Sequence, residues 1–474
     1  MSLAFTHEGA IALVQMFCIS DMLPGQITLL SYIFMKTITK LLSFCLALVL
    51  LLATVMPFEA MASTLADPNL PTGLSQEEVF LLSILSNASG DKVQGSSKYL
   101  SEQLEEFVNN VISCPNGNDV LSDYCDDVEM LSDWELVWGP YVIISPIYRP
   151  SELLCSSEEK YLADYDFPPK RCYPANSMFV VKKDNHYLVA IAGTNPASIY
   201  DWFGLDFAVG VLKPWDENPD ETGQLSSGTD RGLNNLMGMG SDKETLLDFL
   251  RNRDGITDIT FAGHSLGGAL APVLALKIKE ELENGIPIYV YPSAGPTPGN
   301  DIFAQYYNEN LGDTTTRLWN ELDVVPHAWN TTLLHEIPTL YYQEGGDLYY
   351  SDKVQTLVDK LIKFVDDKNY THINDTDPEN TESTVIVDLN EKKSIHFMCE
   401  AYFPIEEKTP TIEIKDPNLK AFLKQTGYQH TDAYAKILGV EKEYCTLFKL
   451  TGLFETSPDR EKAGLESLVL KSQQ

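Results

Sequence analysis

A glycine-rich hexapeptide, GHSLGG at residues 263–268, constrains this chain more than any other feature. It lies between the apolar run 259–262 and a helix-like run at 269–282. A strand that enters a helix through so tight a turn strains the central serine, and only glycines let the two arms approach. The pattern predicts a nucleophile elbow with the Ser265 hydroxyl exposed at a helix N-terminus, where the Leu266 N–H and the helix dipole stabilise an oxyanion. The alternative is an ordinary glycine-rich loop.

Strand and helix patterns alternate around this turn. Two apolar runs, 177–183 and 186–192, are separated by Asp184-Asn185, which predicts a hairpin. Further strands are expected at 259–262, 288–291 and 317–320, with helices at 267–284 and 302–310. This alternation predicts an α/β fold with a mainly parallel central sheet flanked by helices. Catalytic groups of such sheets lie on loops at the carboxyl ends of the strands.

The start of the chain has the pattern of a secretory leader. Residues 35–62 form a signal peptide in this interpretation, with two lysines before an apolar stretch and a small-x-small cleavage motif that ends at Ala62. Residues 1–34 are then an upstream extension. The alternative is a membrane anchor, but the apolar run is near the lower limit for spanning a bilayer. We therefore expect a secreted protein, extracellular or periplasmic.

The remaining chain divides into a lead-in and a catalytic domain. Residues 63–176 are predicted to be mostly helical and to contain disulfides, with helices at 75–87 and 98–112. Residues 177–474 are predicted to form the catalytic domain. An acidic insertion at about 343–400, around an amphipathic helix at 353–365, is expected before the C-terminal helix.

Six cysteines follow the leader, and an even number in an exported chain predicts disulfides. They are Cys114, Cys125, Cys155, Cys172, Cys399 and Cys445. The local pairs Cys114–Cys125 and Cys155–Cys172 would each close a short loop and stabilise the fold by about 3 kcal/mol. Pairing of Cys399 with Cys445 follows only by elimination. Free buried thiols are the alternative, and no spacing argues for a zinc site.

The charge balance limits the partners. The chain has 68 acidic and 34 basic residues, which is far too negative for nucleic-acid binding by counterion release. Anionic lipid headgroups would have to be contacted through a local apolar or basic patch.

A serine nucleophile needs a histidine base and a carboxylate that orients it, in the chain order Ser, acid, His on this kind of sheet. Asp323 follows the expected strand 317–320 and is the candidate acid. Among eight histidines, His430 is the candidate base, because we expect it on a loop before a helix at 432–438. His396, in an apolar strand-like run, is the alternative.

Four segments in this order resemble the class 3 lipase family, which includes the secreted fungal triacylglycerol lipases. They are AIAGT at 190–194 with DWFGLD at 201–206, the elbow, VYPSAGPTPGN at 290–300, and NELDVVP at 320–326. The resemblance covers about residues 177–330. It implies an α/β-hydrolase fold that hydrolyses carboxylic esters without a cofactor. It assigns Ser265, Asp323 and His430 to a catalytic triad, and the backbone N–H groups of Thr194 and Leu266 to the oxyanion hole. The interval from Asp323 to His430 is longer than the family usually shows.

The segment 199–212 is dense in aromatic and aliphatic residues, and in similar enzymes this region holds the lid. Trp202, Phe203 and Leu205 are candidate acyl contacts, with core packing as the alternative. The expected function is a secreted lipase that releases fatty acids from acylglycerols, with a membrane or lipid-droplet surface as a transient partner. Phospholipase A1 and short-chain carboxylesterase are alternatives within the class. A non-catalytic lipid-binding or host-interaction protein is the alternative outside it. The oligomeric state is left open.

Overall fold

The computed structural model describes residues 70–71, 73–89, 97–113, 122–146, 172–193, 209–240, 242–282, 285–341, 350–374, 399 and 416–454. The predicted leader, the candidate lid residues at 199–208 and the insertion residues 375–398 lie outside these ranges.

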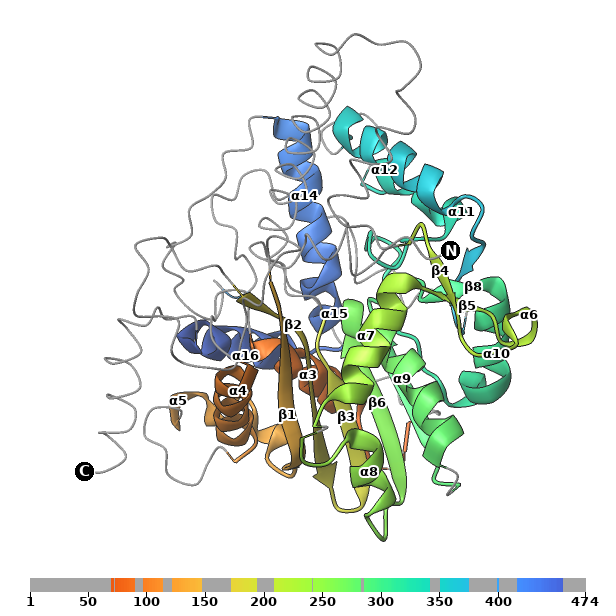
Figure 1. The fold of residues 1–474 in the computed structure, drawn as a ribbon. Coiled ribbons are helices and arrows are strands. Elements are labelled where there is room, and N and C mark those ends of the chain that lie inside the picture. The colour runs from red at the N-terminus through yellow and green to blue at the C-terminus, as the bar shows by residue number, and fades with distance from the viewer. Residues whose placement is uncertain are drawn as a thin grey trace, which may run out of the picture.

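A five-stranded sheet lies at the centre of the molecule, in the order β1-β2-β3-β6-β7 (Figure 1). Its strands are β1 (Glu135–Pro146), β2 (Cys172–Lys183), β3 (His186–Ile191), β6 (Asp258–His264) and β7 (Ile288–Ser293). The pairs β1–β2 and β2–β3 are antiparallel, whereas β3–β6 and β6–β7 are parallel. The expected α/β class, with parallel strands around the elbow, is confirmed.

The predicted hairpin joins β2 and β3. Lys183 pairs with His186, so the turn consists of Asp184 and Asn185. Asp184 has a φ of +54°, in the left-handed region that Asp and Asn tolerate better than most residues. The local sequence therefore explains both the turn and its length.

One strand of the sheet was not expected, and one expected strand needs correction. The strand β1 lies in the lead-in 63–176, where the described elements before it are all helical, and its residues 135–146 are rich in the β-branched and aromatic residues that favour strands. The run 317–320 is no regular strand. It joins β7 through the isolated parallel bridge Ser293–Leu318, and the N–H of Asn320 donates to the Tyr434 hydroxyl instead of to a strand.

Helices cover both faces of the sheet, because alternate strand residues point to opposite sides. On one face, Val189 and Phe261 belong to a core with α7 (Ser227–Gly238), α8 (Leu246–Arg251), α9 (Leu266–Leu282) and α10 (Asp301–Leu311). On the other face, Leu188 and Ala262 belong to a core with α3 (Gln76–Leu85), α4 (Ser97–Ile112), α15 (Asp432–Ile437) and α16 (Glu441–Phe454). The lead-in helices α3 and α4 thus form part of the main body (Figure 1).

Further elements surround this body. In Figure 1, α12 (Asp352–Val365) and α14 (Pro417–His430) extend above the sheet. A small second sheet contains β4 (Leu212–Pro214), β5 (Gln224–Ser226), β8 (Gly299–Asn300) and β9 (Tyr370–Thr371). The short helices are η1 (Ser86–Ser89), α5 (Ser122–Cys125), η2 (Glu129–Leu131), α6 (Pro219–Thr222), η6 (Gly312–Thr314), α11 (Thr331–Leu334) and η7 (Ile337–Thr339).

A disulfide joins Cys399 to Cys445 in α16, the pair expected by elimination. Cys125 is also disulfide-bonded, while Cys114 and Cys155 lie outside the described ranges. Among the helices that the structure describes, none has both the length and the apolar character needed to cross a membrane.

Candidate active site

The turn from β6 into α9 has the strained backbone that the GHSLGG sequence predicts. Ser265 has a φ of +61°, which is uncommon for a residue with a Cβ. A Cβ on Gly263 would lie 2.3 Å from the Gly267 oxygen, and one on Gly267 would lie 2.2 Å from the Ile191 oxygen. The Ser265 N–H donates to the Ser293 oxygen at the end of β7, at 3.0 Å. The strand, turn and helix therefore pack too closely for larger residues.

His430 lies against the Ser265 side chain. Its Nε2 is 2.8 Å from Ser265 Oγ, and its Nδ1 is 2.8 Å from Asp323 Oδ2. Because a carboxylate only accepts hydrogen bonds, the Nδ1 carries the proton and the Nε2 accepts from the serine hydroxyl. His430 is the last residue of α14 and not a loop residue as expected. The helix ends there because Thr431 leaves the helical conformation, with a φ of −125° and a ψ of −69°.

Asp323 is fully buried and well supplied with donors. Besides His430, its Oδ2 accepts from the Tyr434 hydroxyl at 2.9 Å, and its Oδ1 accepts from the Val325 N–H at 3.0 Å. Three donors therefore reach the two oxygens of this carboxyl group. Burial, and then the charge of Asp323, hold the pKa of Tyr434 well above its usual range, so the phenol keeps its proton and donates.

Residues next to the triad connect the turn that carries Asp323 to the chain on both sides of His430. The side-chain Nδ2 of Asn320 donates to Gln429 Oε1 at 2.8 Å and to the Gln429 carbonyl at 3.0 Å. The Asn320 N–H donates to the Tyr434 hydroxyl at 3.1 Å. The turn that carries Asp323 is therefore bonded to residues on both sides of His430.

The other described histidines have different surroundings. The His264 ring centroid is 4.9 Å from that of His430, and burial, then the charge of His430, hold the pKa of His264 well below its usual range. His327 Nδ1 bonds to the Asp323 carbonyl at 2.7 Å, and burial lowers its pKa. His186 pairs with Asp258 at 2.6 Å, at the far end of the parallel strands. The alternative base, His396, lies outside the described residues.

The predicted oxyanion donors are only partly described. Leu266 is the first residue of α9 and is buried, so its N–H lies at the helix N-terminus beside Ser265. Thr194 and the candidate acyl contacts Trp202, Phe203 and Leu205 lie outside the described residues.

Two residues near the site, Tyr434 and Asn87, were not predicted from the sequence. Tyr434 lies in the helix expected at 432–438, and its closeness to His430 along the chain was the available signal. Asn87 is in the lead-in, and its Oδ1 accepts from the Gly193 N–H at 2.6 Å. No pattern in the sequence points to that contact.

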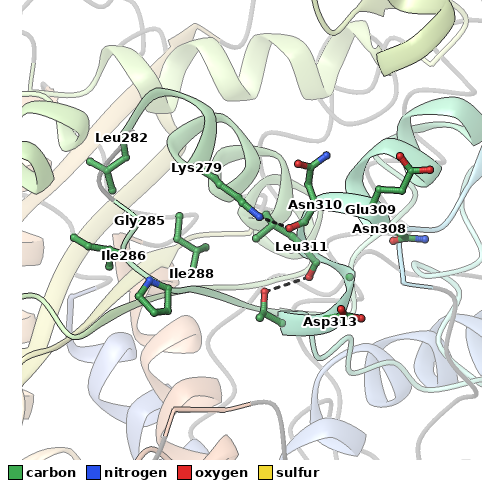
Figure 2. A pocket seen from close by; sticks show the side chains of 13 residues that line it. Lys279, Leu282, Gly285, Ile286, Ile288, Asn308, Glu309, Asn310, Leu311 and Asp313 are labelled. Carbon is green, nitrogen blue, oxygen red and sulfur yellow. Dashed lines mark hydrogen bonds between the residues drawn. The ribbon is translucent and has the colours of Figure 1, made fainter.

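A surface cavity of about 380 Å³ lies away from the triad (Figure 2). Its lining includes Lys279 and Leu282 from the end of α9, and Ile288 from the start of β7. Since Ser293, next to the elbow, is at the other end of β7, the cavity lies at the opposite end of the strand. Among the described residues, no group of three or more His, Cys, Asp or Glu side chains could hold a metal ion.

Comparisons with known proteins find similarity to lipases. Residues 188–332 match the family model described as Lipase (class 3). Two secreted mono- and diacylglycerol lipases of Malassezia globosa are 28% and 30% identical over 161 and 160 residues, 32% of this chain in each case. The chain spans about half the length of these curated relatives, 50% of each.

A solved structure extends the likeness beyond the family segment. The crystal structure of M37 lipase superposes with a TM-score of 0.56 and 27% sequence identity, over 80% of this chain and 98% of that one. The shared fold therefore includes much of the chain on both sides of residues 188–332.

Proposed function

We propose that the protein hydrolyses carboxylic esters, with acylglycerols as its substrate class, because residues 188–332 match the family model described as Lipase (class 3). The observation that carries the proposal is the hydrogen-bonded series from Ser265 through His430 to Asp323, with the serine on a strained turn at a helix N-terminus. Serine, histidine and aspartate in this arrangement are the components of acyl transfer through an acyl-enzyme.

In the proposed mechanism, His430 Nε2 takes the Ser265 proton as the serine oxygen attacks the ester carbonyl carbon. The N–H groups of Leu266 and Thr194 stabilise the resulting oxyanion, the second of these by resemblance to the family. One such donor contributes about 3 kcal/mol of transition-state stabilisation. The protonated His430 is stabilised by Asp323 and gives its proton to the leaving alcohol. Water then attacks the acyl-enzyme, again with His430 as base, and releases the carboxylic acid.

The substrate class is proposed from the relatives, which are named mono- and diacylglycerol lipases. A fatty acid and a partially or fully deacylated glycerol would be the products. A lipid surface would then be the transient partner, because acylglycerols with long chains do not dissolve as single molecules.

We also propose that the chain is exported and loses residues 1–62. The secreted relatives and the cleavage motif at Ala62 support this. Expression of the full chain in a secreting host, followed by intact-mass analysis of the medium, tests it. A secreted product that begins at Ser63 is expected, and a chain that stays membrane-bound with its leader would contradict the proposal.

The activity is tested with p-nitrophenyl esters of increasing chain length, using the protein from Ser63 onward beside Ser265→Ala. Loss of hydrolysis by a thousandfold or more in the alanine variant is expected. Fatty-acid release from diacylglycerol and from phosphatidylcholine then separates a lipase from a phospholipase. Equal rates for the two proteins, together with no labelling of Ser265 by a fluorophosphonate, would refute an esterase and leave a binding protein.

A further inference from the structure

A side chain from the lead-in reaches the backbone beside the nucleophile. Asn87 in η1 accepts the Gly193 N–H through Oδ1 at 2.6 Å, and its Nδ2 donates to the Ser83 carbonyl at 3.1 Å. The two partners fix the orientation of the amide, because an N–H requires an acceptor and a carbonyl requires a donor. An amide side chain satisfies both partners at once.

Gly193 itself lies directly against the elbow. A Cβ at this position would be 2.7 Å from the His264 oxygen and 3.1 Å from Ser265 Cβ. The N–H of the preceding Ala192 donates to the Ser177 carbonyl at 3.0 Å. The backbone at 192–193 is therefore held from two sides, by β2 and by Asn87, at the point where the chain continues to residue 194.

The turn that carries Asn87, and the helix before it, are bonded to strand β2 of the central sheet. The Ser177 hydroxyl of β2 donates to the Ser86 carbonyl at 2.7 Å. The preceding helix α3 begins with a reciprocal capping box between Ser75 and Glu78, and Glu78 also pairs with Lys183 of β2 at 2.7 Å. The turn that presents Asn87 is thus tied to the same strand that holds Ala192.

We propose that Asn87 is a positioning residue for acyl transfer: it holds Gly193 against the elbow and so fixes the backbone that leads into the oxyanion-hole segment. This role rests on the proposed hydrolase function. A displacement of about 1 Å in a positioned group can lower a rate by about a hundredfold. We therefore expect Asn87→Ala to lower kcat by about ten- to a hundredfold. KM for a short ester should change little, because Asn87 acts on the backbone beside the reacting atoms.

The test compares two Asn87 variants with a control in the same turn. Asn87→Ala removes both hydrogen bonds. Asn87→Ser keeps a hydroxyl that can bond to the turn, as Ser86 does to the Ser83 carbonyl at 2.6 Å, but it is too short to replace the bond to Gly193. Ser86→Ala is the control, because it removes a buried hydrogen bond of the same turn and leaves the Asn87 amide in place.

For each protein, kcat and KM for p-nitrophenyl butyrate, the rate of Ser265 labelling by a fluorophosphonate, and Tm are measured. Both Asn87 variants should have a lower kcat and a slower labelling rate, with KM nearly unchanged. Ser86→Ala should have a lower Tm and an unchanged kcat. If Asn87→Ala does not fold, Asn87→Ser tests the positioning role instead.

Wild-type kcat in a folded Asn87 variant would overturn the positioning role, as would a kcat loss that follows Tm equally in Ser86→Ala. Wild-type protein without Ser265-dependent hydrolysis would instead refute the proposed function. The two failures are therefore distinguishable.

Discussion

The Tyr434 hydroxyl lies between the buried acid of the site and the backbone, so its removal should cost stability more than catalysis. It donates to Asp323 Oδ2 at 2.9 Å and accepts from the Asn320 N–H at 3.1 Å. Tyr434 and Asp323 are both fully buried. Tyr434→Phe keeps the ring and its packing, and it removes only these two hydrogen bonds.

The magnitude follows from the two partners. A hydrogen bond to a charged group contributes about 1.5–3 kcal/mol, and a buried N–H left without a partner costs about 1–3 kcal/mol. Small local shifts relieve part of the second cost, so the free energy of unfolding should fall by about 2–4 kcal/mol. The His430 and Val325 donors to Asp323 remain, so kcat should fall less than about tenfold. Asp323→Asn, in contrast, disturbs the histidine tautomer and should cost about 10⁴-fold in kcat.

Urea unfolding followed by tryptophan fluorescence measures the first quantity, and ester hydrolysis measures the second. Tyr307→Phe is the matched control, because the buried Tyr307 hydroxyl shares a hydrogen bond with the neutral Thr315 hydroxyl at 2.7 Å. Its loss should cost about 1 kcal/mol. The reasoning is refuted if Tyr434→Phe is no more destabilising than Tyr307→Phe, or if it abolishes hydrolysis in a folded protein.

Three further changes test other parts of the structure. Gly267→Ala should lower kcat at least a hundredfold and reduce Tm, because its Cβ would lie 2.2 Å from a backbone oxygen; Gly238→Ala, with open space around its Cβ, should be tolerated in the same assays. Burial holds the pKa of Asp432 well above its usual range. The folded state therefore keeps a proton that the unfolded chain loses near pH 4. Above pH 4, the free energy of unfolding should fall as pH rises, by up to about 1.4 kcal/mol per pH unit. Asp432→Asn should therefore stabilise the protein more at pH 8 than at pH 5 in urea unfolding, and an equal effect at both would contradict this sign. Replacing Cys399 and Cys445 with serine should cost about 2–4 kcal/mol by the same measurement, and an unchanged unfolding midpoint would show that the disulfide adds little.

The elements that the sequence predicted correctly are those determined by local patterns. The glycines around Ser265 and the Asp184-Asn185 turn each depend on backbone geometry within a few residues, which the residue types reveal. Asp323 was expected after a strand at 317–320; that run is no regular strand, but Leu318 still bridges to Ser293 of β7, so Asp323 follows the next segment that joins the sheet. Each of these inferences needs only neighbours in the chain or the regular alternation of an α/β sheet.

The features that the sequence did not predict depend on tertiary contacts. β1 was not predicted, although residues 135–146 are rich in β-branched and aromatic residues, and it is completed as a strand by its pairing with β2 at residues 172–183. The contact between Asn87 and Gly193 joins residues 106 positions apart. A polar side chain in a helical lead-in gives no sign of such a partner, since Asn is also common at helix ends and turns.

The long interval between acid and histidine is explained by how the junction of α14 and α15 is held. His430 and Asp323 are 107 positions apart, yet Gln429 bonds to Asn320 on one side of the histidine and Tyr434 bonds to Asp323 on the other. The entropic cost of closing a loop grows only with the logarithm of its length. An insertion between the two residues therefore costs little as long as these contacts survive. It follows that the residues flanking a histidine, rather than its distance from the acid along the chain, are the better guide to the base. A Gln429→Ala variant should then disturb the position of His430, and so lower kcat, more than shortening the expected insertion at about 343–400 does.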